Sequence, residues 1–311
     1  MHGHLKPIRV AFLGPIGTYS HQVKPPPFGC TAAETLSRLR SISFADVFNA
    51  VASKATHVGV VPQENSIFGS VIETYDALRA RDVGFIQGEV VLEVQHCLLV
   101  RHGVKQKDIQ TIKSHEQALG QCRGFLAKNF PSASLEKVAS TAAAAEAVLT
   151  SSDSAAICSK LCATVFDGLE TLFESIQDQN SKSSLPSLLF HWLTPLPGNF
   201  TRFYVISGTR DTELPPPPDP VPGKTRCLIR LSSRTDAFPA PAITQLLTAL
   251  AIPVSRLDRR PQLENKRLFH DVYFAELGCG ESDSDAWPAD IERGIERVRA
   301  SGGEADLLGI W

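Results

Sequence analysis

The chain has 311 residues, with 31 Lys and Arg against 33 Asp and Glu, and a formal net charge of -2. This length predicts two domains, or two domains and a small module, and the balanced charge argues against a basic nucleic-acid binder. No apolar run reaches the roughly 18 residues of a membrane helix, so we expect no membrane partner. The N-terminal segment has neither a signal-type nor a transit-type pattern, which favours a cytoplasmic protein.

The cysteine and histidine patterns argue against a metal site. Seven cysteines are spread along the chain without a CxxC pair, which predicts reduced, mostly buried thiols rather than a disulfide framework. The histidines form no HxxxH or HExxH pair, and the phosphate-binding patterns GxGxxG and GxxxxGKS/T do not occur. We therefore expect no metal and no nucleotide cofactor.

Strands and helices alternate over the first two thirds of the chain, which predicts an α/β fold with a mostly parallel sheet. The β-rich run at 84–100 exceeds the usual length of one strand, so we expect it to cross into a second lobe. That lobe continues the same alternation. The expected strands are 8–13, 57–61, 109–113, 155–158 and 200–207, and the expected helices are 44–52, 70–80, 116–128 and 141–149.

Two segments interrupt this alternation. Residues 179–198 are rich in Ser, Leu and Pro and are expected to form a loop insertion, and ELPPPPDPVPG at 213–223 predicts a stiff polyproline spacer. After the spacer, the order strand, helix, strand, strand, helix, strand is the ferredoxin-like βαββαβ order. Its expected strands are 226–231, 254–257, 269–277 and 307–311, and its expected helices are 242–251 and 289–300.

The sequence therefore divides into three parts. We expect a two-lobed α/β region at 6–210, a Pro-rich linker at 211–223 and a βαββαβ module at 224–311. Within the first region, lobe 1 is expected to cover about 6–85 and 199–210, and lobe 2 about 86–198.

Four short motifs place small polar residues where strands end and helices begin, the edge at which open α/β sheets bind ligands. They are GPIGTYS at 14–20, VPQENSIFGSV at 61–71, KSHEQALGQC at 113–122 and STAAAA at 140–145. The last three have Ser, Asn or Thr just before a helix, so helix capping is one interpretation. Together the motifs also provide several helix N-termini, whose free N–H groups favour a small carboxylate anion.

A fifth motif, NFTRFYVIS at 199–207, is typical of a strand. Strand alternation places Asn199, Thr201 and Phe203 on one face and Arg202 on the other. Thr201 and Arg202 therefore cannot both point at one ligand, so one of them has a supporting role.

These segments, in this order and over nearly the whole chain, resemble the prephenate dehydratase family, which converts prephenate to phenylpyruvate in phenylalanine biosynthesis. The Gln177-Asp178 pair is part of the resemblance. It implies a two-lobed region of the periplasmic-binding-protein type II fold followed by an ACT regulatory domain. It also implies prephenate as the substrate, phenylalanine as the effector, no cofactor, and a homodimer or homotetramer. Arogenate dehydratase and a non-catalytic small-molecule sensor of two-lobed type remain alternatives.

The resemblance also implies roles for individual residues. Thr201 would donate a hydrogen bond or proton to the departing hydroxyl. The other catalytic candidates, which would hold the carboxylates and orient the ring, are Asn65, Ser66 and Asn199. The substrate-binding candidates are Glu64 in a scaffold role, Ser114, His115, Ser140, Thr141, Arg202 and Phe203, the last as an apolar wall. Arg202 is either an anchor for the pyruvyl carboxylate or a buried partner for an acid such as Glu64 or Asp178.

The implied effector site departs from the family pattern. Where the family has Gly-Ala-Leu-Val, this chain has Pro241, Ala242, Ile243 and Thr244. Where the family has Glu-Ser-Arg-Pro, this chain has Asp258, Arg259, Arg260 and Pro261. We therefore expect phenylalanine to bind at a subunit interface formed by these two segments and to inhibit more weakly than in the family, with the proline spacer coupling the module stiffly to the lobes.

Overall fold

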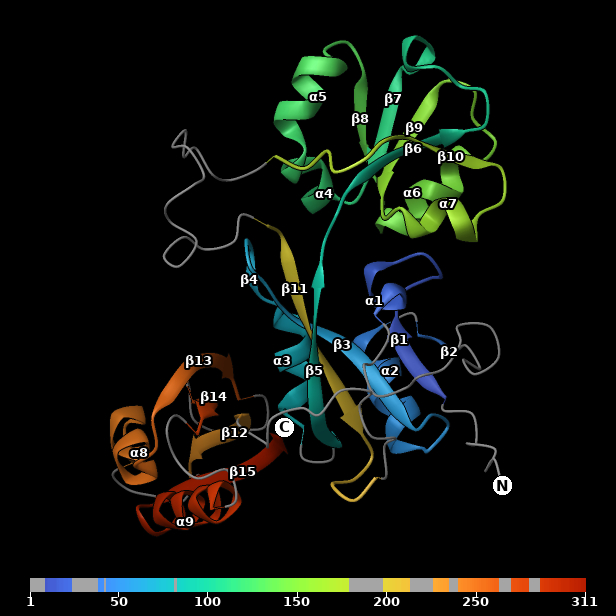
Figure 1. The fold of residues 1–311 in the computed structure, drawn as a ribbon. Helices are drawn as coiled ribbons and strands as arrows, with labels where there is room; N and C mark the ends of the chain where they lie inside the picture. Colours follow the sequence, from blue (N-terminus) through green and yellow to red (C-terminus); the bar gives the residue numbers. More distant parts are fainter. Residues whose placement is uncertain are drawn as a thin grey trace.

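The computed structural model describes residues 9–23, 39–41, 43–80, 83–178, 198–212, 226–234, 240–262, 270–279 and 286–311, with the backbone alone at 39–41. The two lobes lie one above the other in Figure 1, and the C-terminal module lies beside the first lobe. Most of the expected loop insertion at 179–198 and of the linker at 211–223 falls outside the described residues. Among the described helices, none is long and apolar enough to cross a membrane.

The first lobe is built on a sheet whose strands come from both ends of the two-lobed region. Its strands are β1 (Val10–Leu13), β2 (Leu39–Ser41), β3 (Val58–Asn65), β4 (Gly69–Ser70), β5 (Phe85–Glu93) and β11 (Phe200–Ser207), and its helices are α1 (Tyr19–Gln22), α2 (Phe44–Ala52) and α3 (Ile72–Leu78). β1 pairs in parallel with β2 and β3. β11 returns from the second lobe and lies antiparallel between β3 and β5.

The second lobe contains a five-stranded sheet in the order β10-β6-β9-β7-β8. Its strands are β6 (Cys97–Arg101), β7 (Thr111–Ser114), β8 (Ser134–Lys137), β9 (Ser154–Cys158) and β10 (Leu169–Phe173). Its helices are η1 (Gln106–Asp108), α4 (Glu116–Gln121), α5 (Arg123–Asn129), α6 (Thr141–Val148) and α7 (Leu161–Val165).

Two expectations for these lobes need correction. β5 continues the first sheet to Glu93, paired with β11, so the crossover lies at 94–96 and not at residue 86. The single helix expected at 116–128 is two helices that meet at Cys122. The carboxylate of Asp178 accepts hydrogen bonds from the N–H groups of Gly124 (2.7 Å) and Phe125 (3.1 Å), which caps α5 as a separate helix.

The C-terminal module has the expected βαββαβ order. Its elements are β12 (Arg226–Ser233), α8 (Ile243–Leu250), β13 (Val254–Pro261), β14 (Asp271–Gly278), α9 (Trp287–Ala300) and β15 (Gly303–Ile310). The strands lie in the order β13-β14-β12-β15, and both β13 and β15 are longer than expected because they pair along most of their length with β14 and β12. Backbone pairing across a sheet, rather than local apolar pattern, sets these strand ends.

The module is joined to the first lobe through its sheet. Gly309 of β15 pairs in parallel with Ile86 of β5, which links the two sheets into one of ten strands. A Cβ atom on Gly309 would lie 2.4 Å from the Cβ of Ile86, so a residue with a side chain could not approach this closely. Arg230 of β12 also donates to the carbonyl oxygens of Leu78 (3.2 Å) and Arg79 (3.0 Å) at the end of α3.

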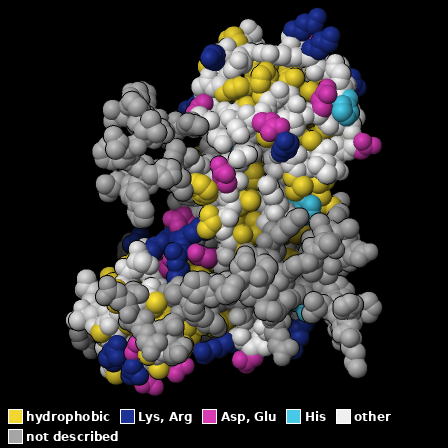
Figure 2. All heavy atoms as spheres, viewed as in Figure 1, with side chains coloured by type: hydrophobic (Ala, Val, Ile, Leu, Met, Phe, Trp, Pro, Cys, Tyr) yellow, Lys and Arg dark blue, Asp and Glu magenta, His cyan; other side chains and the backbone are white. Residues whose placement is uncertain are grey.

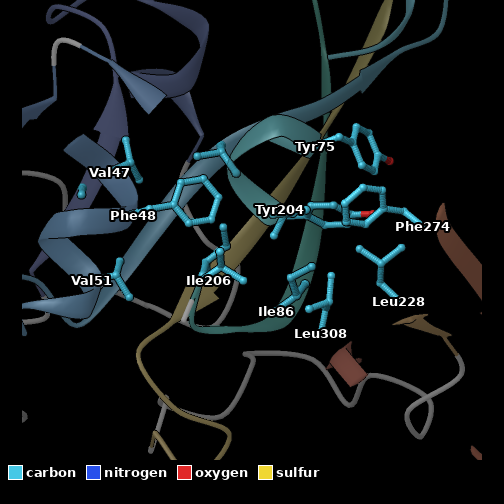
Figure 3. Close-up of a cluster of buried hydrophobic side chains, with 14 of the residues drawn as sticks. Val47, Phe48, Val51, Tyr75, Ile86, Tyr204, Ile206, Leu228, Phe274 and Leu308 are labelled. Carbon is cyan, nitrogen blue, oxygen red and sulfur yellow. The ribbon is translucent and has the colours of Figure 1, made fainter. Parts of the chain in front are cut away.

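A hydrophobic core shared by the first lobe and the module lies at this junction (Figure 3). Phe48, Tyr75 and Tyr204 come from the first lobe, and Leu228 and Phe274 from the module. The rings of Tyr75 and Phe274 are 5.2 Å apart between centroids. Because apolar contacts within such a core are lost if the parts separate, the module is held against the lobe by packing as well as by backbone pairing.

Candidate active site

Three polar side chains meet at the end of the strand pair β3/β11 that points toward the second lobe. Thr201 pairs with Asn65 in the antiparallel register, and Asn199 lies at the entry to β11. The amide nitrogen of Asn65 donates to Oδ1 of Asn199 (2.7 Å) and to Oγ1 of Thr201 (3.0 Å). Thr201 and Asn199 are buried, with 9% and 3% of their surfaces exposed. The structure thus brings these three residues together, although Asn65 and Thr201 are 136 positions apart in the sequence.

The orientation of these amides follows from the hydrogen bonds around them. The Oδ1 atom of Asn65 accepts from the backbone N–H groups of Ile67 (3.0 Å) and Phe68 (3.1 Å), so its Nδ2 must face Thr201 and Asn199. Thr201 accepts a hydrogen bond from Asn65, which leaves its hydroxyl proton available to a ligand. Among the described residues, the Nδ2 atom of Asn199 is buried without a hydrogen-bond partner. A buried donor of this kind calls for an acceptor, and a carboxylate or hydroxyl oxygen of a ligand would satisfy it.

Ser66 and Phe203 flank this group, and each makes contacts within the protein. The hydroxyl of Ser66 donates to the carbonyl of Gly198 (3.3 Å) and accepts from the N–H of Phe200 (2.9 Å), so it holds the start of β11 against β3. Phe203 shares the face of Thr201 but is 1% exposed, in a core with Val10 and Val60. The proposed apolar wall is therefore a packed part of the sheet beneath Thr201.

Arg202 lies on the opposite face of β11, as alternation predicts. Its guanidinium contacts Oε2 of Glu64 (2.6 Å), Oε1 of Glu276 (3.1 Å) and Oε2 of Glu89 (3.5 Å). Of the two roles left open for Arg202, this geometry favours the buried partner of acids and not the carboxylate anchor. Asp178, the other acid considered, instead caps α5.

The candidates in the second lobe lie at the starts of α4 and α6. The side chain of Ser114 is enclosed, and its hydroxyl donates to the carbonyl of Ile157 (2.6 Å), so it supports the sheet and does not face a ligand. His115 is the N-cap of α4 and Ser140 is the N-cap of α6, where its Oγ accepts from the N–H of Ala143 (3.0 Å). Thr141 follows in the first turn of α6 and is half-buried. The capping interpretation is therefore confirmed for Ser140, whereas α4 is capped by His115 and not by Ser114, and the N-cap of α3 is Val71, which makes no side-chain cap.

The GPIGTYS motif contacts the second lobe directly. The carbonyl of Gly17 accepts from the thiol of Cys162 (3.2 Å), and Gln22 accepts from the hydroxyl of Ser159 (2.9 Å). A Cβ atom on Gly17 would lie 3.0 Å from Sγ of Cys162 and 3.5 Å from the Cβ of Ala142 in α6. The absence of a side chain at Gly17 therefore lets the lobes touch beside the N-terminus of α6.

Replacing Gly17 by alanine is expected to destabilise the protein more than the same change at Gly103. Both glycines have positive φ, +97° and +85°, where a non-glycine residue costs about 1–3 kcal/mol. Gly103 has open space around its Cβ position, whereas Gly17 faces Cys162 and Phe166, so we expect about 1–3 kcal/mol more at Gly17. Urea unfolding of both variants measures the difference. Equal losses would show that the contact between the lobes tolerates a methyl group.

A hydrogen-bonded group at the crossover between the lobes was not assigned a role from the sequence. The hydroxyl of Tyr19 contacts the carbonyl of Gln95 (3.0 Å) and Nδ1 of His96 (2.7 Å), and Nε2 of His96 contacts Oε1 of Gln121. The N–H of His96 donates to Oε1 of Gln177 (3.0 Å). Tyr19, Gln121 and Gln177 lie in the sequence motifs and could have indicated this group. Their spacing along the chain, however, does not reveal that all three contact His96.

The neutral form of His96 is favoured in the fold, which predicts a pH dependence of stability. Burial lowers the pKa of His96 below its ordinary 6.5, and the hydrogen bond with Gln121 opposes this only in part. Below pH 6.5 the unfolded chain therefore binds a proton at this histidine that the folded chain does not, and stability falls as the pH drops.

We expect the unfolding midpoint of the wild type to drop from pH 7 to pH 5 by more than that of a His96→Gln variant. The side chains that face His96 in the described structure, Tyr19, Gln121 and Gln177, carry no charge over this range, so the difference isolates the histidine. Thermal unfolding at several pH values measures it. Parallel profiles for the two proteins would contradict the assignment.

The two segments expected to bind an effector make different contacts in the described structure of one chain. At the start of α8, the N–H of Ala242 donates to Oε1 of Gln245 (2.8 Å), the carbonyl of Pro241 accepts from Ser233 (2.8 Å), and Ile243 packs on the module core. Thr244 is exposed and lines a shallow hollow of about 330 Å³ on the outer face of α8, together with Gln245, Thr248 and Ala249.

Most of the second segment faces the first lobe. Asp258 accepts a hydrogen bond from the hydroxyl of Ser70 in β4. Arg260 binds the carboxylate of Asp76 in α3 through two contacts (2.6 and 2.9 Å), and the carbonyl of Pro261 accepts from Arg79 (2.6 Å). Arg259 lies on the exposed side of β13 and pairs with Asp271 (3.2 Å). Asp258 and Arg260 therefore bind the module to the lobe, a role that was not expected for them.

The described ranges contain no group of three or more His, Cys, Asp and Glu side chains that could hold a metal ion. The site consists instead of a hydroxyl and two amides at the end of a strand pair. Fold and site together define a two-lobed α/β protein with a neutral hydrogen-bonding site and an attached βαββαβ module.

Comparisons with known proteins agree with this architecture. The family described as prephenate dehydratase matches residues 10–184. A bifunctional chorismate mutase/prephenate dehydratase of Pseudomonas aeruginosa is 33% identical over 275 residues, which make up 88% of this chain and 66% of that protein. The chain belongs to the prephenate dehydratase family. It spans 66%, 63% and 49% of the curated relatives from P. aeruginosa, Stutzerimonas stutzeri and Aquifex aeolicus.

Solved structures extend the similarity to the module. A prephenate dehydratase from Arthrobacter aurescens, solved in complex with L-Phe, superposes with a TM-score of 0.73 at 25% identity. The superposition covers 97% of this chain and 89% of the A. aurescens chain. A structure described as a quorum quenching acylase superposes with a TM-score of 0.70 at 26% identity and covers 97% of both chains. The two lobes have the architecture of type II binding proteins, as expected.

Proposed function

We propose that this chain catalyses the decarboxylating dehydration of prephenate to phenylpyruvate. The observation that carries the proposal is the arrangement at Thr201, whose oxygen accepts from Asn65 so that its proton is not used in that bond. Beside it lies the Nδ2 atom of Asn199, which has no partner in the part of the chain that the structure describes. Two neutral donors side by side suit a substrate that has carboxylates and a departing hydroxyl. Membership of the prephenate dehydratase family supports the same assignment.

The reaction breaks two bonds of the substrate ring. Carbon dioxide leaves, the electron pair of the broken C–C bond enters the ring, and the C–O bond on the opposite carbon breaks. The departing hydroxide takes up a proton and leaves as water, and the ring becomes aromatic. Thr201 would donate a hydrogen bond to that oxygen as negative charge develops on it. A threonine hydroxyl is a very weak acid, so this hydrogen bond explains catalysis better than complete proton transfer.

Neutral amides suit the rest of the site for an energetic reason. A salt bridge to the ring carboxylate would stabilise the reactant more than the transition state, in which that charge disappears. Hydrogen bonds from Asn199, and from helix N-termini such as that of α6, would orient carboxylates with a weaker preference for the reactant. Arg202, the nearest arginine in the sequence motif, is kept on the opposite face by its three carboxylate partners.

The purified full chain, treated with a chelator, is the protein to test. We expect prephenate to be converted to phenylpyruvate, measured by the ultraviolet absorbance of its enolate in alkali, without a requirement for a divalent metal. Arogenate offered under the same conditions tests the alternative substrate, with phenylalanine as the product. Turnover of neither compound, with binding of a small carboxylate, would favour the sensor alternative and overturn the proposal.

We further propose that phenylalanine binds the module and lowers activity. The related A. aurescens protein binds L-Phe, and the βαββαβ fold and the 241–244 turn of this chain support a similar site. One face of β13 contacts the first lobe. The ligand would therefore lie between the 241–244 turn of one subunit and the exposed side of β13 in another, within a homodimer or homotetramer. Cytoplasmic residence likewise stays a prediction from the sequence.

Calorimetry of the full chain with phenylalanine tests this regulation. We expect weak binding, together with inhibition at millimolar phenylalanine, because Pro241 and Thr244 alter the turn that the effector would approach. Light scattering under the same conditions reports the oligomeric state. No heat of binding, together with activity that is indifferent to millimolar phenylalanine, would mean that the module has kept its fold without this effector.

A further inference from the structure

The strand pair that carries the site has a second polar pair directly behind it. In the register of β3 and β11, Thr201 pairs with Asn65 and Arg202 pairs with Glu64. Because successive residues of a strand point to opposite faces, the first pair faces the site and the second faces the module. A displacement of Arg202 or Glu64 therefore moves the backbone that positions Thr201 and Asn65.

Side chains of the module hold both members of the rear pair. Glu276 of β14 accepts two hydrogen bonds from Arg202 (3.1 and 3.2 Å), and Arg256 of β13 forms an ion pair with Glu64. Arg226 of β12 extends the network through Glu89 of β5 (2.9 Å). Figure 2 shows positive and negative side chains gathered where the module meets the first lobe.

The centre of the network is shielded from water, so its contacts there are stronger than ordinary surface pairs, while the side chains of Glu64 and Arg226 are 29% and 43% exposed. Glu276 is 5% exposed, and the side chains of Arg256 and Arg202 are 16% and 20% exposed. Removing one member of such a group leaves its partners with less compensating charge, and the remaining groups then rearrange. The network therefore transmits a change in the module to the strand pair more directly than a solvated ion pair would.

We propose that Glu276 and Arg256 are positioning residues for the site: through Arg202 and Glu64, the module holds the β3/β11 strand pair so that Thr201 and Asn65 keep their alignment. This inference rests on the proposed dehydratase activity for its kinetic consequence. It also identifies the contact through which a ligand of the module would change turnover, because any arrangement of the module that withdraws Glu276 or Arg256 releases the strand pair.

The test compares Glu276→Gln with Glu296→Gln in the full chain. Glu296 is an exposed glutamate of α9, so its replacement controls for the loss of one negative charge. We expect Glu276→Gln to lower kcat for prephenate at least about 5-fold with a smaller change in KM, while Glu296→Gln stays within about twofold of the wild type. Thermal unfolding checks that both variants are folded at the assay temperature.

A third variant separates positioning from general weakening of the fold. If Glu276 acts through Thr201, Glu276→Gln should lower kcat by less than about twofold in a chain that already carries Thr201→Ala. A loss of about 5-fold or more in that background would show that Glu276 acts on turnover by another route, and would overturn the proposal.

Amide hydrogen exchange keeps the test independent of the reaction. Exchange at 64–66 and 199–203 should be faster in Glu276→Gln than in Glu296→Gln, with no change in β7 and β9 of the second lobe. If the wild type does not convert prephenate, the proposed function fails while exchange still decides the coupling. Unchanged exchange at 199–203, or equal kcat for the two variants, would overturn the inference.

Discussion

Replacing Thr201 by alanine is expected to lower kcat for prephenate by roughly 100-fold or more, with KM changed by less than about threefold. The hydroxyl accepts from Asn65 (3.0 Å), so its single proton is not used in that hydrogen bond and can be donated to a ligand. A donor used mainly in the transition state contributes about 3 kcal/mol to the rate and little to substrate binding. Steady-state kinetics with the full chain measures both constants.

Thr201→Ser is the matched control, because serine keeps the hydroxyl and loses only a methyl group. We expect it to retain at least about a tenth of the wild-type kcat. Thr201 is 9% exposed, so the folded state of each variant is checked by thermal unfolding before its kinetics are compared. An alanine variant that turns over at the wild-type rate would remove Thr201 from the mechanism.

Replacing Arg202 by leucine is expected to lower the free energy of unfolding by about 2–4 kcal/mol. The change would remove one guanidinium partner from each of Glu64 and Glu276, which would keep Arg256 and Arg226 respectively, and the side chain of Glu276 is only 6% exposed. Arg202→Lys keeps the charge but loses the forked geometry that reaches both acids, so its loss should be smaller. Urea unfolding measures both variants.

Arg259→Leu provides the control for Arg202. Its side chain is 66% exposed and pairs with Asp271 (3.2 Å), so we expect a loss of at most about 1 kcal/mol. The two roles considered for Arg202 predict opposite patterns. If Arg202→Lys instead raised KM for prephenate and left the free energy of unfolding unchanged, Arg202 would be the carboxylate anchor. That result would contradict the structural role inferred from its position behind the strand.

The positions of most secondary-structure elements follow from local pattern, but their ends do not. The apolar run and turn residues locate β1, α2 and the βαββαβ order of the module. By contrast, β5 runs on to Glu93, and the helices α4 and α5 are separate because Asp178, far along the chain, caps the second of them. Strand pairing and capping by distant residues decide these ends, and neither is encoded in a local window of sequence.

For the site, the sequence alone determined which face each residue of the last strand of the lobes occupies. A period of two places Thr201 and Asn199 opposite to Arg202 wherever the strand lies. Only the tertiary structure decided what each face meets: the register that sets Asn65 beside Thr201, and the module whose Glu276 binds Arg202. Alternation is a property of the backbone geometry of one strand, whereas register and partners depend on how segments more than seventy positions apart pack together.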